Sequence, residues 1–219
     1  MRLFTFQHIA PYYDLFAQLV FGNTLDKAQK HFFSLIPQGS SILIIGGGSG
    51  RILPYLLKNV RPKKITYVEA SSNMLKIAKR KSRKILKNSQ NNIELTFIHG
   101  TEDNISAVQK YDVLMTFFLF DIYPTHQARK LANKLSDYLK PSGSWLFADF
   151  CLEGQGFQLI WKHIMLKLMY SFFRLVSNLQ NQSLPDYKSI FKELHYFPVE
   201  QQFFYRRFIV SIIYRKLLS

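Results

Sequence analysis

The positions of hydrophobic residues divide the chain into short apolar runs and amphipathic segments that alternate from residue 41 to residue 150. Short runs rich in β-branched and aromatic residues indicate strands, whereas apolar positions repeating every three to four residues indicate helices. The expected strands cover 41–45, 65–69, 93–98, 113–120 and 144–150. Because segments with helical periodicity lie between them, for example at 51–57 and 125–139, they predict a mostly parallel, doubly wound α/β sheet.

The segments on either side of this alternating region follow other patterns. Residues 1–36 have helical periodicity, interrupted near Pro11 and Gly22, and predict an N-terminal helical cap. A lid-like segment is expected at 151–196, and two β-rich runs around Arg206 predict an antiparallel strand pair at 197–219. With a core at 37–150 and no repeat or low-complexity linker, residues 1–219 are expected to form a single domain.

Within the lid-like segment, a helix expected from about 157 to 180 is apolar around most of its circumference. Its polar residues recur every three or four positions and so share one face: His163, Lys167, Tyr170, Ser171, Arg174 and Asn178. An apolar band this wide exceeds what one sheet face usually covers. The helix therefore lines an acceptor pocket, joins a partner subunit, rests on a membrane surface or is simply buried in the core. We favour a lid over an apolar acceptor.

The feature of the composition that bears most on function is the charge. The chain has 29 Lys and Arg against 14 Asp and Glu, a formal net charge of +15, which favours nucleic acid, an anionic membrane surface or an anionic substrate as a partner. The densest basic run, at 76–87, alternates with apolar residues at helical spacing. We interpret it as the solvated face of an amphipathic helix rather than as a binding patch.

Cysteine usage and the longest apolar stretch bear on location. The single cysteine, Cys151, cannot form an internal disulfide and leaves no cysteine cluster for zinc, so no structural metal is expected. The first residues lack the apolar core of a signal peptide, and Lys162, Lys167 and Arg174 interrupt the apolar stretch at 157–176, which argues against a transmembrane segment. We therefore expect a cytoplasmic protein.

A glycine-rich turn at 46–50 follows the first expected strand and precedes a helical pattern. Glycine has no Cβ and tolerates positive φ, so such a turn lets the backbone approach a ligand closely. The dinucleotide fingerprint would require a glycine at Arg51, and this disfavours nicotinamide or flavin dinucleotides. Glu69, 23 residues after Gly46 at the end of the second expected strand, can accept hydrogen bonds from both hydroxyls of a ribose.

Five motifs occur in a characteristic order, at 42–50, 68–71, 99–103, 111–115 and 139–143. On these motifs the chain resembles the class I S-adenosylmethionine (SAM)-dependent methyltransferases over nearly its full length. The segments at 10–14 and 184–187 are similar to those of small bacterial methyltransferases of the quinone-biosynthesis type.

The resemblance implies a seven-stranded sheet, mostly parallel with an antiparallel last strand, helices on both faces, and SAM as cofactor. It assigns cofactor binding to Gly46, Gly47, Gly48, Gly50, Glu69, Ala70, Thr101, Glu102 and Phe117. The chain departs from the family pattern at two positions. Ile44 stands where an acidic residue usually meets the methionine ammonium, and Thr101 stands where an aspartate usually meets the adenine amine, a role that Glu102 or Asp103 can take over.

Methyl transfer from a sulfonium is an in-line displacement, so positioning supplies much of the catalysis and a base is needed only if the acceptor must lose a proton. The candidate bases are His8, Tyr12, Tyr13, Asp121, His126 and Asp149. For each of them a capping or surface role is the alternative. We select Tyr13 and Asp121 as catalytic candidates. No metal-ligand spacing occurs in the sequence, and no metal is expected.

Three functions remain open at this point. The preferred one is methyl transfer to a small lipophilic or aromatic acceptor, with peripheral membrane contact as an accompanying option. The net charge motivates an RNA or protein methyltransferase, although 118–121 reads Phe-Leu-Phe-Asp and lacks the Asn-Pro-Pro-aromatic motif of base amino-group methylation. The third is a non-catalytic SAM-fold binding module, which Ile44 and Thr101 make conceivable. The sequence leaves the oligomeric state open.

Overall fold

The computed structural model describes residues 20–87, 93–106, 108–177 and 183–217. Within them a seven-stranded sheet has the order β3-β2-β1-β4-β5-β7-β6. The five strands β1 to β5 run parallel, β7 is antiparallel to β5, and β6 is antiparallel to β7. The strands are β1 Ser41–Ile45, β2 Lys64–Glu69, β3 Glu94–His99, β4 Tyr111–Phe117, β5 Leu139–Phe150, β6 Tyr196–Phe204 and β7 Ile209–Lys216. This topology confirms the expected fold class, including the antiparallel last strand.

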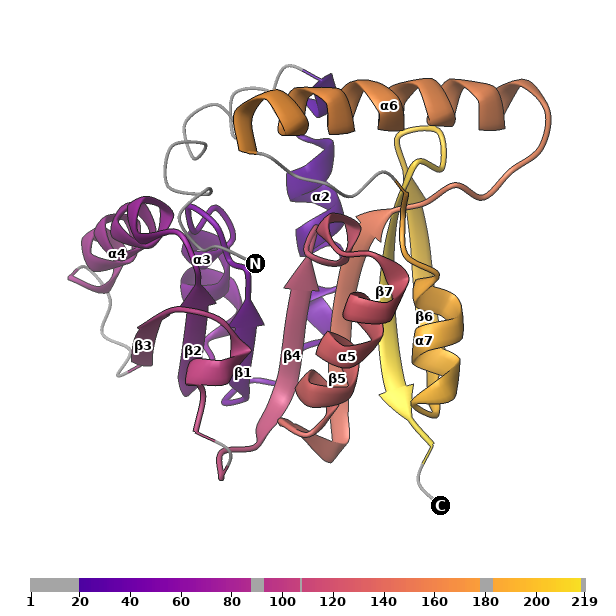
Figure 1. Ribbon diagram of the computed structural model, residues 1–219. Coiled ribbons are helices and arrows are strands. Elements are labelled where there is room, and N and C mark those ends of the chain that lie inside the picture. Colours follow the sequence, from indigo (N-terminus) through magenta and orange to yellow (C-terminus); the bar gives the residue numbers. More distant parts are fainter. Residues whose placement is uncertain (1–19, 88–92, 107, 178–182, 218–219) are drawn as a thin grey trace.

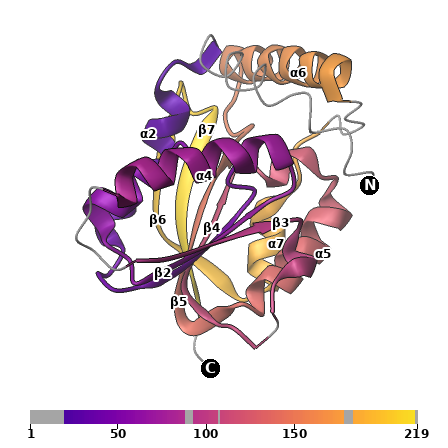
Figure 2. The same ribbon diagram turned by 90° about the vertical axis from the view of Figure 1, so that its left-hand side faces the viewer.

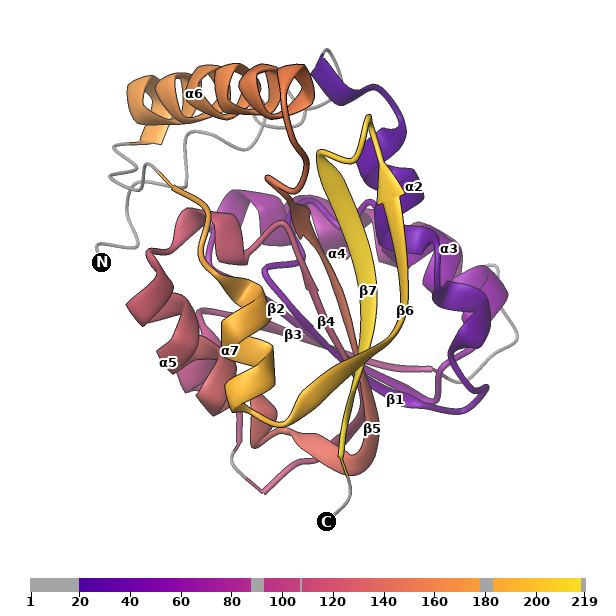
Figure 3. The same cartoon turned by 90° about the vertical axis from the view of Figure 1, so that its right-hand side faces the viewer.

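Helices cover both faces of the sheet (Figures 1 and 3). One face carries α2 Thr24–Lys30, α3 Leu53–Tyr55 and α4 Ser72–Leu86, and the other carries α5 Thr125–Ser136 and α7 Tyr187–Glu193. Side chains of β1 alternate between the two layers: Ile42 and Ile44 pack toward α3 and α4, and Leu43 and Ile45 pack toward α5 and α7. A sheet buried on both faces explains the continuous apolar runs in the sequence.

The last long helix, α6 Phe157–Ser177, lies across the carboxyl ends of the parallel strands rather than on a face of the sheet (Figure 1). Figure 2 shows it above α4. Its inward side packs on Phe150 at the end of β5, on Phe21 and on the turn between β6 and β7. Among the described residues, no helix is long and apolar enough to cross a membrane.

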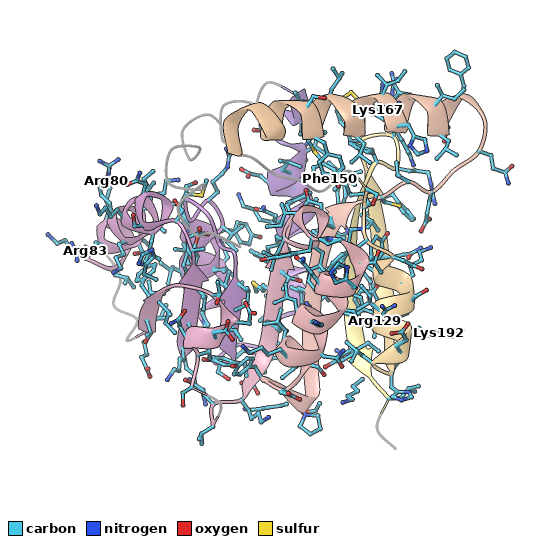
Figure 4. The ribbon with its side chains drawn as sticks, viewed as in Figure 1. Arg80, Arg83, Arg129, Phe150, Lys167 and Lys192 are labelled. Atoms are coloured by element: carbon cyan, nitrogen blue, oxygen red, sulfur yellow. The ribbon has the colours of Figure 1, made fainter. Side chains whose placement is uncertain are left out.

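The basic run at 76–87 lies on α4, as expected. Leu75 and Ala78 are buried against the sheet, whereas Arg80 and Arg83 project outward (Figure 4). Ser71 is the N-cap of this helix and accepts a hydrogen bond from the Met74 amide at 3.3 Å. The interpretation as a solvated helix face is therefore consistent with the structure.

Several element boundaries differ from those expected. Strand β5 begins at Leu139 rather than at 144, because Leu139 pairs with Tyr111 before a register shift brings Ser144 opposite Val113. Residues 140–143, which separate the expected helix at 125–139 from the expected strand at 144–150, thus form an irregularity within the strand. Helix α5 ends at Ser136, and the helical stretch expected at 51–57 consists of α3 followed by a π-helical turn, Leu56–Val60.

The expected N-terminal cap lies largely outside the described residues, and so does the catalytic candidate Tyr13. Its described part consists of α2 and a 3-10 turn, Phe33–Leu35. Asp26 of α2 receives two hydrogen bonds from Arg51, at 3.0 and 3.1 Å, so this helix is tied to the residue that follows the glycine turn. The cap and the glycine turn therefore meet at the carboxyl edge of the sheet.

Candidate functional site

The glycine turn joins β1 to α3 at the carboxyl edge of the sheet. Gly46, Gly48 and Gly50 have φ values of 66°, 63° and 73°, in the left-handed region that favours glycine. A Cβ on Gly47 would lie 2.1 Å from the Tyr67 ring, and a Cβ on Gly50 would lie 2.8 Å from the Ala78 Cβ. Gly48 differs, because an added Cβ would meet only the Met74 Sδ, at 3.8 Å. Gly48 therefore borders open space, as a ligand-facing residue requires.

Glu69 connects this turn to the next one. Its Oε2 accepts a hydrogen bond from the Gly48 amide and its Oε1 accepts one from the Ser71 amide, both at 2.7 Å. The backbone carbonyl of Glu69 accepts a third hydrogen bond, from the Gly100 amide at 3.1 Å. One residue thus holds together the three turns that follow β1, β2 and β3.

The Glu69 carboxylate is almost fully buried, with an exposed fraction of 7%. Burial raises its pKa above the ordinary value, and the amides of Ser71 and Gly48 act in the opposite direction. A carboxylate has about four lone-pair positions, so two amide hydrogen bonds leave room for hydroxyl donors from a ligand. The geometry is compatible with the ribose role expected for Glu69.

The third turn carries Gly100, Thr101 and Glu102. Thr101 caps a 3-10 turn, Glu102–Asn104, by accepting a hydrogen bond from the Asp103 amide at 3.3 Å. The Thr101 hydroxyl also lies 3.4 Å from the Asp103 carboxylate, while its own amide donates to the Asn104 side chain. Thr101 therefore shapes the turn, and Glu102 is the partly exposed acid at this position.

Two further residues at the carboxyl edge of the sheet, Tyr67 and Tyr123, were not predicted from the sequence. Tyr67 donates a hydrogen bond to the Gly48 carbonyl at 3.0 Å and packs under Gly47. Tyr123 follows β4, and its pKa is raised to about 12 by burial and by the negative charges of Glu102 and Glu69. Tyr123 therefore lies near both acids. Neither tyrosine is part of a local sequence motif, since each acts through contacts between distant segments.

Asp121 and Asp149 form a buried acidic pair beside this edge, with exposed fractions of 4% and 2%. Asp149 accepts hydrogen bonds from the amides of Phe120 at 3.1 Å and Phe150 at 2.8 Å, and so fixes the loop after β4. Burial raises the pKa of both carboxyl groups, and the charge of Asp121 raises that of Asp149 further. The structure thus brings together two of the expected candidate bases.

The other candidates are less central. Phe117 ends β4 and packs near Phe33, at a ring distance of 6.1 Å, and Ala70 offers its carbonyl to the His99 ring nitrogen at 3.1 Å. His126 is exposed in the first turn of α5. Ile44, the residue that departs from the family pattern, is a fully buried core residue of β1.

One observation supports the fit to SAM without reference to the family resemblance. The space at Gly48 is open, whereas the glycines around it are tightly packed. Glu69 supplies hydrogen-bond acceptors beside that space, and Glu102 lies in the turn that follows β3. The cofactor would supply a methyl group on a positively charged sulfur. The fold and the edge geometry together are compatible with a nucleoside-binding site at the switch of strand order between β1 and β4.

Comparisons with known proteins agree with this class. A family profile described as a methyltransferase domain matches residues 42–143. The chain is 30% identical over 224 residues to a malonyl-[acyl-carrier protein] O-methyltransferase of Priestia megaterium, in an alignment covering 91% of this chain and 76% of the relative.

Solved structures show the same fold at low sequence identity. One is the 1,6-didemethyltoxoflavin-N1-methyltransferase of Burkholderia thailandensis with bound S-adenosylhomocysteine, at a TM-score of 0.67 and 12% identity, covering 98% of this chain and 87% of that one. Another is the magnesium protoporphyrin IX methyltransferase of Synechocystis PCC 6803, also with the demethylated cofactor, at a TM-score of 0.63 and 16% identity, covering 89% and 82%.

The chain belongs to the class I SAM-dependent methyltransferases. It is an enzyme of that class and its cofactor is SAM. The expected resemblance is confirmed at this level, and the finer similarity to quinone-biosynthesis enzymes stays a prediction.

Proposed function

We propose that the enzyme transfers the SAM methyl group to a small acceptor with an apolar or aromatic body. The observation that carries the proposal is an aromatic cluster next to the buried acids. Phe118 follows β4 with a φ of 51°, and its ring lies 5.2 Å from that of Phe150. A positive φ is strained for a phenylalanine, and such strain concentrates at functional sites.

The cluster continues beneath α6. Phe150 packs on Phe21 at 5.5 Å and on Phe208 at 5.2 Å, and Met169 and Tyr170 close it from α6. Tyr170 donates a hydrogen bond to the Asp121 carbonyl at 3.0 Å. This contact links the helix directly to the loop that carries the candidate base, and it supports the role of α6 as a cover over the acceptor side.

In this proposal the residues of the chain act by position and by proton transfer. The glycine turn and Glu69 orient the donor, and the aromatic cluster excludes water around the acceptor. Where the acceptor loses a proton, the Asp121 carboxylate accepts it, because its raised pKa places the group close to neutral pH. Tyr13, outside the described residues, remains the second proposed catalytic group.

The test is methyl transfer from radiolabelled SAM into fractions of a cell extract, separated by polarity. The expected result is label in a low-molecular-weight, organic-soluble product that requires active enzyme. Label only in macromolecular fractions would contradict the small-acceptor proposal and favour an RNA or protein target. Heat-inactivated enzyme is the control.

A second candidate acceptor is a carboxyl group attached to an acidic carrier protein. It is favoured by the Priestia megaterium relative, whose name gives a malonyl-acyl-carrier substrate, and by the net charge of +15, which complements an acidic partner. In the same assay this candidate places the label on a small acidic protein. Mild alkaline hydrolysis would then release it as methanol, because the product is a methyl ester.

A further inference from the structure

Helix α6 has apolar residues on two opposite sides. Its inward side carries Leu166, Met169 and Tyr170, all buried at 2–4% exposure. Its outward side carries four large apolar side chains that face solvent: Phe157 at 88%, Ile160 at 57%, Ile164 at 52% and Leu168 at 58%. We name these four residues the α6 strip.

The α6 strip is continuous. Its members are spaced by three, four and four residues, so they follow one side of the helix over three turns. Single exposed hydrophobic residues are common on protein surfaces, but a contiguous row of them marks an interaction site. The inward side already anchors the helix to the fold, so the strip is not needed for packing.

Basic groups border the strip on both sides. Lys167 and His163 are exposed on one side (Lys167 is labelled in Figure 4). On the other side the Arg206 guanidinium lies 5.7 Å from the centre of the Trp161 ring, in a turn whose residues 205–207 all have positive φ. Residues 157–177 contain no aspartate or glutamate.

The nearest acid in the preceding segment is already neutralised. Glu153 pairs with Lys188 and lies 3.7 Å from Arg207. A central apolar row flanked by cations is the pattern of a helix that lies in the plane of a membrane interface, where cations meet anionic headgroups.

We propose that the α6 strip docks the enzyme on an anionic membrane surface. The four strip residues enter the headgroup region, and Lys167 and Arg206 contact lipid phosphates. The net charge of +15 adds long-range attraction. A second copy of the chain is a poorer occupant, because pairing two strips brings two sets of basic borders together without acids to neutralise them.

The inference does not depend on the acceptor proposed above. It does place the aromatic cluster of Phe150 and Phe118, which lies under α6, close to the lipid surface. An apolar acceptor could then reach the site without crossing water.

The test is sedimentation of the full chain with sucrose-loaded vesicles of phosphatidylcholine, alone or with 30% phosphatidylglycerol added, an amount chosen to be on the order of natural anionic membranes. We expect binding to the anionic vesicles at least about tenfold stronger than to the neutral ones, weakening as salt is raised. The double variant Ile164→Glu/Leu168→Glu should lose about tenfold or more of this binding, because two charges cannot enter the interface.

The matched control is Val108→Glu, which adds a charge at a residue 90% exposed in the loop before β4, at the opposite edge of the sheet. It should bind vesicles within about twofold of wild type. Unchanged SAM affinity in the double variant shows that the fold is intact. If that variant does not fold, Lys167→Glu/Arg206→Glu tests the basic border, with the same expected loss.

Three results would overturn the proposal: no binding of wild type to anionic vesicles, equal binding by the strip variants and wild type, or a stable dimer in solution that the strip variants dissociate. The last result would assign the strip to a second copy of the chain.

Discussion

Replacing Glu69 by alanine should weaken SAM binding on the order of tenfold or more. Each hydrogen bond to a charged group contributes about 1.5–3 kcal/mol, and the substitution removes the acceptor for both expected ribose hydroxyls. It also leaves the amides of Gly48 and Ser71 without their 2.7 Å partners, so the glycine turn loses its tie to β2. Isothermal titration calorimetry with SAM measures the first effect.

The same change should lower the free energy of unfolding by about 2–5 kcal/mol, because two amide donors lose their acceptor in a site that water barely reaches. Glu94→Ala is the matched control. Glu94 is a strand carboxylate on β3, 61% exposed and paired with Lys64, and its removal should leave SAM affinity unchanged and stability within about 0.5 kcal/mol. Wild-type SAM affinity in Glu69→Ala would show that the ribose assignment is wrong.

Asp121→Asn should reduce methyl transfer by about 10²–10⁴-fold while leaving SAM affinity within a few-fold of wild type, if the acceptor must lose a proton. The amide keeps the shape of the side chain but cannot take up that proton. The wild-type rate should rise as pH increases through about 7, where Asp121 ionises, and the residual rate of the variant should lack this rise. Exposed Asp137, at the end of α5, provides the control Asp137→Asn, which should retain full activity.

The buried pair also predicts how stability depends on pH. Both carboxyl groups have pKa values raised in the folded state, that of Asp121 to about 7, so above the ordinary aspartate pKa the folded protein holds more protons than the unfolded chain. Stability from each group is present at low pH and is lost as pH rises, by about 1.4 kcal/mol per pH unit for each proton. Asp121→Asn removes one such group, so the variant should gain stability relative to wild type as pH rises. A parallel pH dependence of the two proteins in urea unfolding would contradict this.

The sequence predicts the parallel core well because its signals are local. An apolar run buried on both faces, as in β1 and β4, needs no tertiary information to be recognised, and the glycine turn with Glu69 at the end of the next strand follows from spacing. The two strands of the tail were likewise visible as β-rich runs around Arg206, and they form β6 and β7.

Other features depend on contacts between distant segments and leave no local pattern. The early start of β5 results from Leu139 pairing with Tyr111 across 28 positions of chain, and the packing of Tyr67 under Gly47 joins residues 20 positions apart. Such contacts decide where a strand begins and which glycine stays open. They also explain why Gly48, and not Gly47 or Gly50, borders open space.

Helix α6 shows why a helix that is apolar on most sides is hard to interpret. Its periodicity groups Tyr170 with the polar face of His163 and Lys167, yet Tyr170 is buried and bound to the Asp121 carbonyl. Lys162, one of the charges that interrupt the apolar stretch in the sequence, is fully buried, and its ammonium donates to the carbonyls of Glu153 and Arg207. Met169 packs inward, whereas Ile164 faces solvent. The position of the helix across the sheet edge determines which of its apolar residues are buried and which are exposed.

The most direct test of the central claim is a calorimetric titration of SAM into the wild-type chain and into Gly48→Ala. We expect micromolar binding by wild type and a loss of about tenfold or more in Gly48→Ala, because the added methyl group enters the open space at this residue. Gly39→Ala is the control: its φ of 73° imposes the same backbone strain, but it lies in the turn before β1, at the opposite edge of the sheet. Wild-type affinity in Gly39→Ala with weakened binding in Gly48→Ala would support the site, whereas no detectable SAM binding by the folded wild-type chain would contradict it.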